Sequence, residues 1–402
     1  MKKILLLGGS AQQIVAITTA KKLGYYTILC DFLEDNPGQY EADKFYLTST
    51  TDKEAVLKIA EDEKVNGVLA YASDPAAPTA AFVAEKLGLL GNPYESVDLL
   101  CNKDKFRKFL RENGFCAPKS EGYTNKDNVI NQVEGFTLPI IVKPVDSSGS
   151  KGITVLHDLD NLEKAVDFAF SFSRSKKIII EEYIEKKHEY LIGGDIFIVN
   201  GHVVLWGLLN CHRDSNVNPL VPVGKSYPLA LGQEDVCNVK ETIQCLVDKL
   251  QLRNGAVNVE LVVDKNSRVW PIDIGPRAGG NMIPDLLGMI YEIDIVEMAV
   301  LSAMGETIDF DISEKNVFYA THNLHTSKNG KYIDIVYKEE LENFIIKKCL
   351  YKNYGETVEY FDNAAKALGI IFMKFENKED MKNIINNITD FYCVRCVNNL
   401  EM

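Results

Sequence analysis

Short apolar runs alternate with helix-periodic segments through the first ninety residues. Each run is about as long as one buried strand, and each longer segment repeats apolar residues at the spacing of one helix face. In chain order, strands and helices are expected in turn at residues 2–7, 14–23, 27–30, 56–62, 67–71 and 76–87. Strands that alternate with helices predict a parallel, doubly wound sheet. We therefore expect residues 1–95 to form a Rossmann-like α/β domain.

The turn after the first expected strand departs from the dinucleotide-binding pattern. It reads GGSAQQ from Gly8, whereas that pattern is GxGxxG, although Asp31 stands where a ribose-binding acid would. We therefore favour a structural or substrate-holding role for this domain over NAD binding.

The pattern changes near residue 96 and again near residue 306. One or two helices are expected at 96–113, with Asn102 and Lys103 in or near a first turn, and further helices at 159–172, 284–304, 341–350 and 378–388. Strands rich in β-branched residues are expected at 140–143, 153–156, 178–181, 190–199, 203–209, 258–264, 269–274, 318–324, 332–336 and 368–375. We expect a central domain at 96–305 and a small C-terminal α+β domain at 306–402.

Composition and charge narrow the class of protein. The chain has 402 residues, 46% hydrophobic and 25% charged, and no apolar run reaches the roughly 18 residues of a membrane span. The apolar core of the N-terminus, residues 4–7, is too short for a signal peptide. A net charge of −13 argues against nucleic-acid and anionic-membrane partners held by bulk electrostatics. We expect a soluble, cytoplasmic protein whose cysteines are free thiols.

The stretch PIIVKPVDSSGSKG, which ends at Gly152, carries the first candidate chemistry. A short apolar strand runs into Lys143 and Pro144, and Pro144 has no N–H with which to continue regular pairing. The flexible loop that follows consists of Ser147, Ser148, Gly149, Ser150, Lys151 and Gly152. Unshielded backbone N–H groups, hydroxyls and lysines in such a loop can converge on phosphate oxygens. An ordinary hairpin loop is the alternative interpretation, and the Walker A string GxxxxGK[ST] is absent.

Two acidic residues stand at matching places in a predicted hairpin. Glu260 and Asp273 are equally far from the turn at residues 266–267, so they can lie side by side on one face. Two carboxylates with nucleotide phosphates are ligands that Mg²⁺ typically takes. A pair of solvated charges on opposite faces is the alternative, but the string GPRAGGN after Asp273 favours metal and places Arg277 close to it.

In this order the motifs resemble those of the ATP-grasp superfamily of carboxylate–amine ligases, such as amino-acid ligases, phosphoribosylglycinamide synthetase and carbamoyl phosphate synthase. The resemblance covers at least residues 96–305: a lysine at the head of a helix, the VKP strand and glycine loop, an EEYI hinge, a following Glu, and two acidic strands ending in PRAGG. It implies a pre-ATP-grasp domain, then an ATP-grasp domain of two α+β subdomains, with the glycine loop in the subdomain at about 115–184. It also implies ATP with Mg or Mn as cofactors, small carboxylate and amine substrates, and a homodimer as a common assembly.

The resemblance implies roles for residues around the nucleotide. Lys103 and Lys143 would contact the ATP phosphates, and the loop at 147–152 would cover the β- and γ-phosphates. Glu189 would bind the ribose hydroxyls. Backbone groups of the hinge would hold adenine; its residues are Glu181, Glu182, Tyr183 and Ile184.

The resemblance also implies that Glu260 and Asp273 ligate Mg and that Arg277 neutralises charge on the γ-phosphate or the activated carboxylate, so that Arg277 and Lys143 are the catalytic candidates. Two positions depart from the family pattern. The family usually has Glu at the second metal position and Asn two residues later, whereas this chain has Asp273 and Gly275. Asn281 is a candidate to replace the missing amide.

The substrate site is less clear from the sequence. Arg213, expected in a loop after the strand at 203–209, and Asp74, at the end of a strand, are candidates to face the substrate. His322 and His325 are expected to be structural. An amino-acid or peptide ligase is the first hypothesis, a phosphoribosylglycinamide-synthetase-like enzyme the second, and a non-catalytic ATP-binding regulator the alternative of another class.

Overall fold

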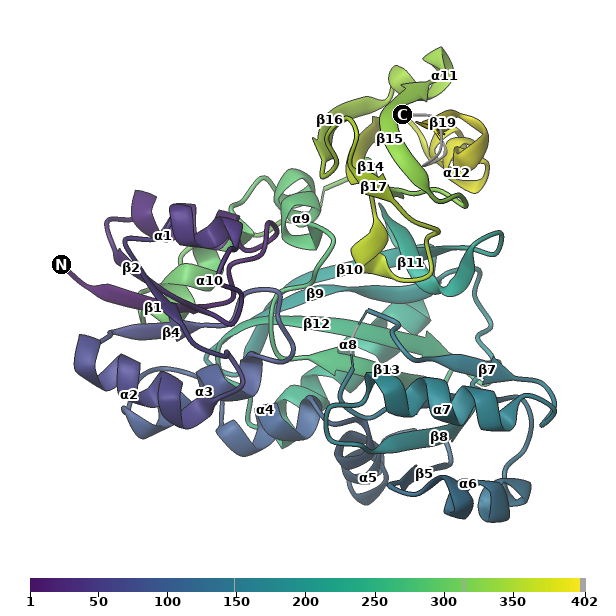
Figure 1. Cartoon of the computed structure of the whole chain (residues 1–402), viewed down its shortest axis with the longest axis horizontal. Helices are drawn as coiled ribbons and strands as arrows, with labels where there is room; N and C mark the ends of the chain where they lie inside the picture. The colour runs from purple at the N-terminus through teal and green to yellow at the C-terminus, as the bar shows by residue number, and fades with distance from the viewer. Residues whose placement is uncertain (148, 314, 398–402) are drawn as a thin grey trace.

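The computed structural model describes residues 1–147, 149–313 and 315–397, and it has the expected mixed α/β architecture (Figure 1). The N-terminal part contains β1 (Lys3–Leu7), α1 (Ile14–Lys22), β2 (Tyr26–Asp31), β3 (Lys44–Leu47), α2 (Lys53–Glu63), β4 (Gly67–Leu69) and α3 (Ala77–Lys86). The sheet has the order β3-β2-β1-β4, and all its strand pairs are parallel, as predicted. The short edge strand β3 was not expected, since its KFYL sequence is half exposed and starts with a charge.

Helices cover both faces of the parallel sheet, so β1 is buried on both faces. Ile4 and Leu6 share a core with α1 and with α10 (Ile295–Ala303), a helix from the central part. Leu5 and Leu7 point the other way, into a core shared with α2 and α3. Burial of alternate residues on opposite faces is what strand geometry requires, and α10 ties the central part to the N-terminal sheet.

The central part contains two sheets that face each other. Its first half consists of α4 (Tyr94–Leu100), α5 (Lys103–Glu112), β5 (Ser120–Tyr123), α6 (Lys126–Gln132), β6 (Ile140–Pro144), β7 (Thr154–Leu156), α7 (Leu162–Phe172) and β8 (Ile178–Glu182). These strands form an antiparallel sheet in the order β5-β8-β6-β7. The second half consists of β9 (Leu191–Val199), β10 (His202–Asp214), β11 (Asn218–Tyr227), α8 (Gln233–Lys249), β12 (Gly255–Val263), β13 (Val269–Gly275), α9 (Ile283–Tyr291) and α10.

The larger sheet continues into the C-terminal part. Its order is β13-β12-β9-β10-β11-β14-β18-β16, so strands from both sides of residue 306 hydrogen-bond within one sheet. The C-terminal elements are β14 (Phe318–Leu324), β15 (Gly330–Tyr337), α11 (Glu339–Glu342), β16 (Ile345–Leu350), β17 (Thr357–Val358), β18 (Gly369–Phe375), α12 (Lys378–Asn386) and β19 (Tyr392–Val397). The expected domain boundaries at 95 and 305 remain predictions.

Three sequence-based expectations were wrong. The helix expected at 341–350 is mostly strand β16, in which alternate residues are exposed and which pairs with β18. The single helix expected at 284–304 is two, because Glu292 ends α9 in a left-handed conformation (φ 59°) and the Asp294 side chain caps α10. Arg213 lies within β10 rather than in a loop after it. Among the described residues, no helix is long and apolar enough to cross a membrane.

Candidate active site

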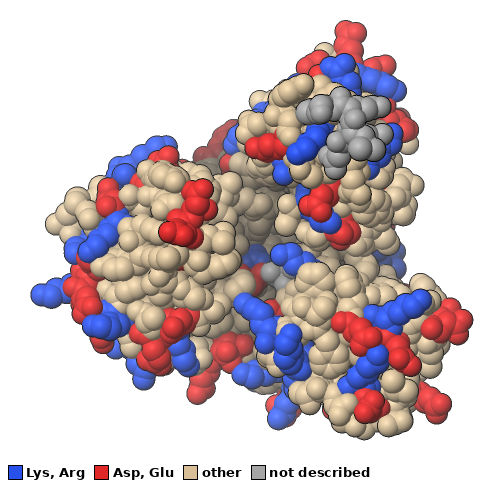
Figure 2. Space-filling model, in the orientation of Figure 1, with Lys and Arg blue, Asp and Glu red and all other residues tan. Residues whose placement is uncertain are grey.

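A cavity of about 600 Å³ lies between the sheet of β6 and β8 and the eight-stranded sheet. Its wall takes residues from β6, from the hinge after β8, from β10 to β13, and from the segment around the end of α12. Figure 2 shows a recess where the three parts of the chain meet, with lysine and arginine side chains near it. Small-molecule sites typically occupy about 300–1,000 Å³, so this cavity has the size of a nucleotide site.

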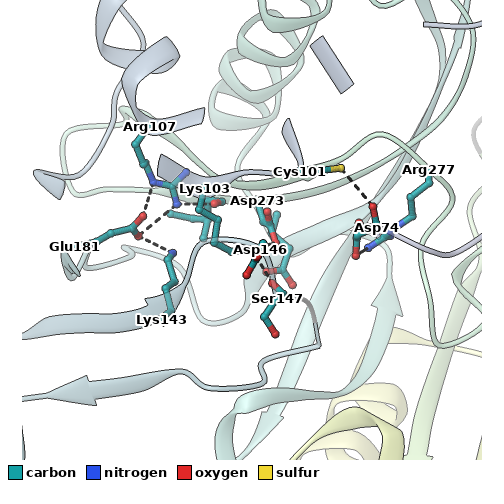
Figure 3. A network of polar contacts seen from close by, with 12 residues as sticks. Asp74, Cys101, Lys103, Arg107, Lys143, Asp146, Ser147, Glu181, Asp273 and Arg277 are labelled. Atoms are coloured by element: carbon teal, nitrogen blue, oxygen red, sulfur yellow. Dashed lines mark hydrogen bonds and ion pairs between the residues drawn. The ribbon is translucent and has the colours of Figure 1, made fainter. Parts of the chain in front are cut away.

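Three buried charged side chains form an ion-pair triad beside the cavity (Figure 3). Lys143 Nζ lies 2.6 Å from Glu181 Oε2, and Arg107 Nε lies 2.8 Å from Glu181 Oε1. Arg107 also donates to the Ile272 carbonyl at 2.6 Å, which ties α5 to β13. Burial opposes charge on Glu181, but the positive charges of Arg107 and Lys143 hold its pKa at about 2. Burial lowers the pKa of Lys143 to about 8, against the attraction of Glu181 and with repulsion from Arg107 and Lys103.

Lys103 stands at the start of α5, as the sequence predicted. The Asn102 side chain caps this helix by accepting from the Lys105 N–H at 3.1 Å. The Lys103 ammonium donates to the Ser147 carbonyl at 3.0 Å and lies 3.6 Å from Asp273 Oδ2. One lysine therefore connects the glycine loop with the acidic hairpin (Figure 3).

The glycine loop projects toward β11. Ser150, in a left-handed conformation (φ 60°), donates from its hydroxyl to the Leu220 carbonyl at 2.8 Å. The remaining predicted loop residues differ in exposure: Gly149 and Lys151 are exposed, Ser147 is half-buried, and Gly152 is buried. Ser148 lies outside the described residues. Ser150 therefore forms part of the cavity wall.

The two predicted metal ligands face each other. Glu260 and Asp273 are directly paired residues of β12 and β13, with a β-bulge just after Glu260. Each has a cation at the edge of ion-pair range: Arg213 lies 3.5 Å from Glu260, and Lys103 lies 3.6 Å from Asp273. No group of three or more His, Cys, Asp or Glu side chains in the described ranges could hold a metal. Two hairpin carboxylates fit a cation that takes its other ligands from bound phosphates, as Mg²⁺ does.

Arg277 lies beyond this hairpin and is paired with Asp74 of the N-terminal part. Its Nε and Nη2 donate to the two Asp74 carboxylate oxygens at 2.7 and 2.6 Å. Although burial opposes it, Asp74 raises the pKa of Arg277, so the guanidinium stays charged. A Cβ at Gly275 would lie 2.9 Å from Asp74 Oδ1 and 3.2 Å from Arg277 Cζ. The bidentate pair therefore occupies the space of a side chain at 275, which explains the glycine there.

Two backbone N–H groups of the predicted hinge are already hydrogen-bonded within the protein. The Glu182 N–H donates to the Lys119 carbonyl at 3.0 Å, and the Tyr183 N–H donates to the Pro139 carbonyl at 2.9 Å. Glu182, Tyr183 and Ile184 nevertheless line the cavity. An adenine ring placed there would use the hinge carbonyls or Ile184 rather than those two N–H groups.

The C-terminal part contributes contacts that the sequence did not predict. Lys382 of α12 pairs with Glu189 at 3.1 Å, and the Tyr190 hydroxyl donates to Asn386 Oδ1 at 3.1 Å. His322 lines the same cavity and is bonded to the Tyr392 hydroxyl at 3.2 Å. No local periodicity signals such contacts, because they join residues 70 to 196 positions apart.

Three other residues show what the sequence missed and where the structure places the remaining candidates. Arg107 could have been found, since it follows Lys103 by four residues and such pairs share a helix face. His325 pairs with Asp214 at 3.1 Å, in keeping with a structural role. Asn281 donates its backbone N–H to Gln12 Oε1 at 3.1 Å, which places it at the N-terminal turn. Its suggested role beside Asp273 remains a prediction.

His212 is buried against Ser226. Its Nε2 lies 2.8 Å from Ser226 Oγ, which itself accepts from the Asn210 amide at 3.0 Å. A serine hydroxyl has two acceptor lone pairs and one donor hydrogen, so Ser226 can bond both the Asn210 amide and the imidazole. Burial, with nearby Lys225 and Arg213, lowers the pKa of His212 to about 3. His212 is therefore neutral at physiological pH.

A family model and several curated proteins are similar to parts of this chain. Residues 136–285 match the family model described as ATP-grasp domain. The large chain of carbamoyl phosphate synthase from Clostridium botulinum (strain Loch Maree / Type A3) is 24% identical over 389 residues, which cover 93% of this chain and 34% of the relative. The corresponding protein of Thermotoga petrophila is 25% identical over 333 residues, covering 78% of this chain and 29% of the relative. The chain spans about a third of the length of these curated relatives.

Solved structures share the whole architecture. L-amino acid ligase from Bacillus licheniformis superposes with a TM-score of 0.83 at 19% identity and covers 99% of both chains. Phosphoribosylglycinamide synthetase from Anaerococcus prevotii gives a TM-score of 0.76 at 22% identity and covers 98% of this chain and 100% of its own. The predicted fold is therefore confirmed over nearly the full length.

Proposed function

We propose that this chain, whose residues 136–285 match the ATP-grasp domain model, is an ATP-dependent carboxylate–amine ligase. The observation that carries the proposal is the meeting of three groups beside the 600 Å³ cavity, whose wall includes Ser150 of the glycine loop and Glu260 of the hairpin. Lys103 contacts the glycine loop at Ser147 and approaches Asp273, which faces Glu260 across the hairpin. We therefore assign phosphate binding to the cations and metal binding to the neighbouring pair of carboxylates.

The proposed reaction has two steps. A substrate carboxylate oxygen attacks the γ-phosphorus of ATP, which gives an acyl phosphate and ADP. An amine nitrogen then attacks the acyl carbon, and phosphate leaves. In-line phosphoryl transfer depends mainly on positioning and on charge stabilisation. The chain therefore needs side chains that hold and neutralise the phosphates, and it needs no nucleophile of its own.

The position of each candidate residue suggests its role in this reaction. Lys103 and Lys143 would hold phosphate oxygens, and Glu181 with Arg107 keeps Lys143 oriented. Glu260 and Asp273 would hold Mg²⁺, which neutralises charge on the β- and γ-phosphates when bound. Arg277, whose charge Asp74 maintains, would face the activated carboxylate.

Replacing Lys103 by Ala should raise the KM for ATP by about tenfold, because a close charged contact to a phosphate contributes roughly 1.5–3 kcal/mol. Lys105→Ala is the matched control, since Lys105 is an exposed lysine in the same turn and pairs with Asp98. Steady-state ADP release at varied ATP measures both variants. An unchanged KM in Lys103→Ala would remove Lys103 from the phosphate site.

The experiment that tests the function is ADP and phosphate release from Mg-ATP with pools of amino acids and other small carboxylates and amines. A ligase requires both pools for release. Release with phosphoribosylamine and glycine alone would favour the second hypothesis, which the likeness to phosphoribosylglycinamide synthetase supports.

ATP binding without release from any pool would favour the non-catalytic regulator, the hypothesis suggested by the shorter Asp273. In that case Asp273→Glu, which leaves Gly275 and the Asp74–Arg277 pair intact, should create turnover.

A further inference from the structure

A second cavity, of about 220 Å³, lies where the N-terminal, central and C-terminal parts meet. The N-terminal part contributes the turn after β1 and the segment after β4, the central part contributes the loop before α9, and the C-terminal part contributes Cys349 and Tyr351. At roughly 30 Å³ per water molecule, the space would hold a molecule with a modest apolar body. None of its lining residues lines the 600 Å³ cavity.

Two residues of the second cavity lie near the Asp74–Arg277 ion pair in the chain. Ala72 and Gly279 line it, and each lies two residues from one partner of the Asp74–Arg277 ion pair. The Asn281 N–H, bonded to Gln12, holds the loop before α9 against the N-terminal turn. On the proposed function, a molecule in this cavity would lie close to the carboxylate that Arg277 faces.

One polar group in the wall lacks a partner. The Tyr351 hydroxyl is buried, and no described residue forms a hydrogen bond with it. An unsatisfied buried hydroxyl costs roughly 1–3 kcal/mol, so such a group in a native structure needs an explanation. A ligand that hydrogen-bonds to Tyr351 would supply one.

The cavity wall offers one carboxylate to a ligand. Asp285 is the one charged side chain among the described lining residues. Lys347 lies 3.0 Å from its Oδ1, on β16, and leaves the second oxygen for another donor. Burial, with the negative charge of Asp285, raises the pKa of both Tyr71 and Tyr351, so both hydroxyls keep their protons and can accept as well as donate.

We propose that this cavity binds the acceptor amine of the ligase reaction, as a small primary amine with an apolar body and no carboxylate at the Asp285 end. The inference rests on the proposed function. The amine enters as an ammonium ion, drawn by Asp285 and the tyrosine hydroxyls, and loses one proton to water. Its neutral nitrogen forms the C–N bond as the C–O bond to phosphate breaks. The electron pair leaves on phosphate, which takes up the proton released from nitrogen.

Binding is tested first, without ATP, by calorimetric titration of the full chain with benzylamine, benzoate and benzyl alcohol. These probes share an aromatic body and differ in the charge of the attached group. Benzylamine should bind, benzoate should not, and benzyl alcohol should bind more weakly than benzylamine. Absence of benzylamine binding, or equal binding of benzoate, would overturn the proposal.

Two variants test whether benzylamine binds in this cavity. Tyr351→Phe removes only the unpartnered hydroxyl, so it should not cost stability, and it should weaken benzylamine binding about fivefold. Tyr354→Phe is its matched control, because Tyr354 is an exposed tyrosine three residues later. Val15→Phe fills the cavity and should weaken binding at least about tenfold. Benzylamine affinity that is unchanged in Val15→Phe would contradict the assignment.

A trapping experiment separates this inference from the proposed function. Hydroxylamine is small enough to reach an acyl phosphate without a shaped site, and it yields a hydroxamate. Val15→Phe should keep hydroxamate formation and lose amide formation. Absence of hydroxamate in the natural chain would count against the ligase proposal, whereas equal amide formation in Val15→Phe would count against the amine cavity alone.

Discussion

Replacing Glu260 by Gln should slow ADP release from Mg-ATP at least about a hundredfold, equivalent to roughly 2.7 kcal/mol of lost transition-state stabilisation. The substitution keeps the shape of the side chain and removes one of two facing carboxylates. A cation that takes only two protein ligands should be bound much more weakly after this loss. The rate should be measured at several Mg²⁺ concentrations, and high Mg²⁺ should restore part of it.

The control for this prediction is Glu234→Gln, which neutralises an exposed acid in the first turn of α8. It should turn over like the natural chain. The Glu260→Gln protein should also unfold at the same denaturant concentration as the natural chain, since Glu260 has only a long contact, 3.5 Å, to Arg213. Full activity in Glu260→Gln would exclude the hairpin as the metal site.

Replacing Arg107 by Met should lower the free energy of unfolding by about 3–5 kcal/mol, because it leaves Glu181 buried with one cation fewer. Arg107 is fully buried, and its guanidinium contacts both Glu181 and the Ile272 carbonyl. Arg111→Met is the matched control: Arg111 is an exposed arginine one turn later on the same helix, and it should change stability by much less. Urea titration followed by circular dichroism measures both.

Two further results would identify charge as the cause. Glu181→Gln should cost less stability in Arg107→Met than in the natural chain, since the Glu181 carboxylate has then already lost one of its two cations. Glu181 has a folded-state pKa of about 2, below its ordinary value of 4.5, so its stabilisation is present above pH 4.5 and is lost as pH falls toward 2. That acid-dependent part should be absent in the Glu181→Gln protein. Equal stability of Arg107→Met and Arg111→Met would contradict the triad account.

Local sequence patterns predicted the elements that present the chemistry. The apolar run before Lys143 formed β6, and the equal spacing of Glu260 and Asp273 from their turn gave the observed register. Both depend on near neighbours in the chain. The position of Lys103 at a helix start followed equally from the local Asn102 cap.

The unpredicted features depend on distant contacts. β16 contains alternating apolar and polar residues, but its strand conformation depends on pairing with β18 about twenty residues later. The Arg107–Glu181 and Asp74–Arg277 pairs join residues 74 and 203 positions apart. Gly275 is explained only once Asp74 is known to fill the adjoining space. The second cavity likewise needs all three parts of the chain.

The most direct test of the ligase proposal is isotope transfer from the substrate acid. Once the pool assay identifies an active carboxylate, that acid is supplied with ¹⁸O in both carboxylate oxygens, and the phosphate released with the amide is examined by mass spectrometry. Attack of the carboxylate on ATP predicts that each released phosphate carries one labelled oxygen. Unlabelled phosphate, formed together with amide, would show that no acyl phosphate forms and would contradict the account.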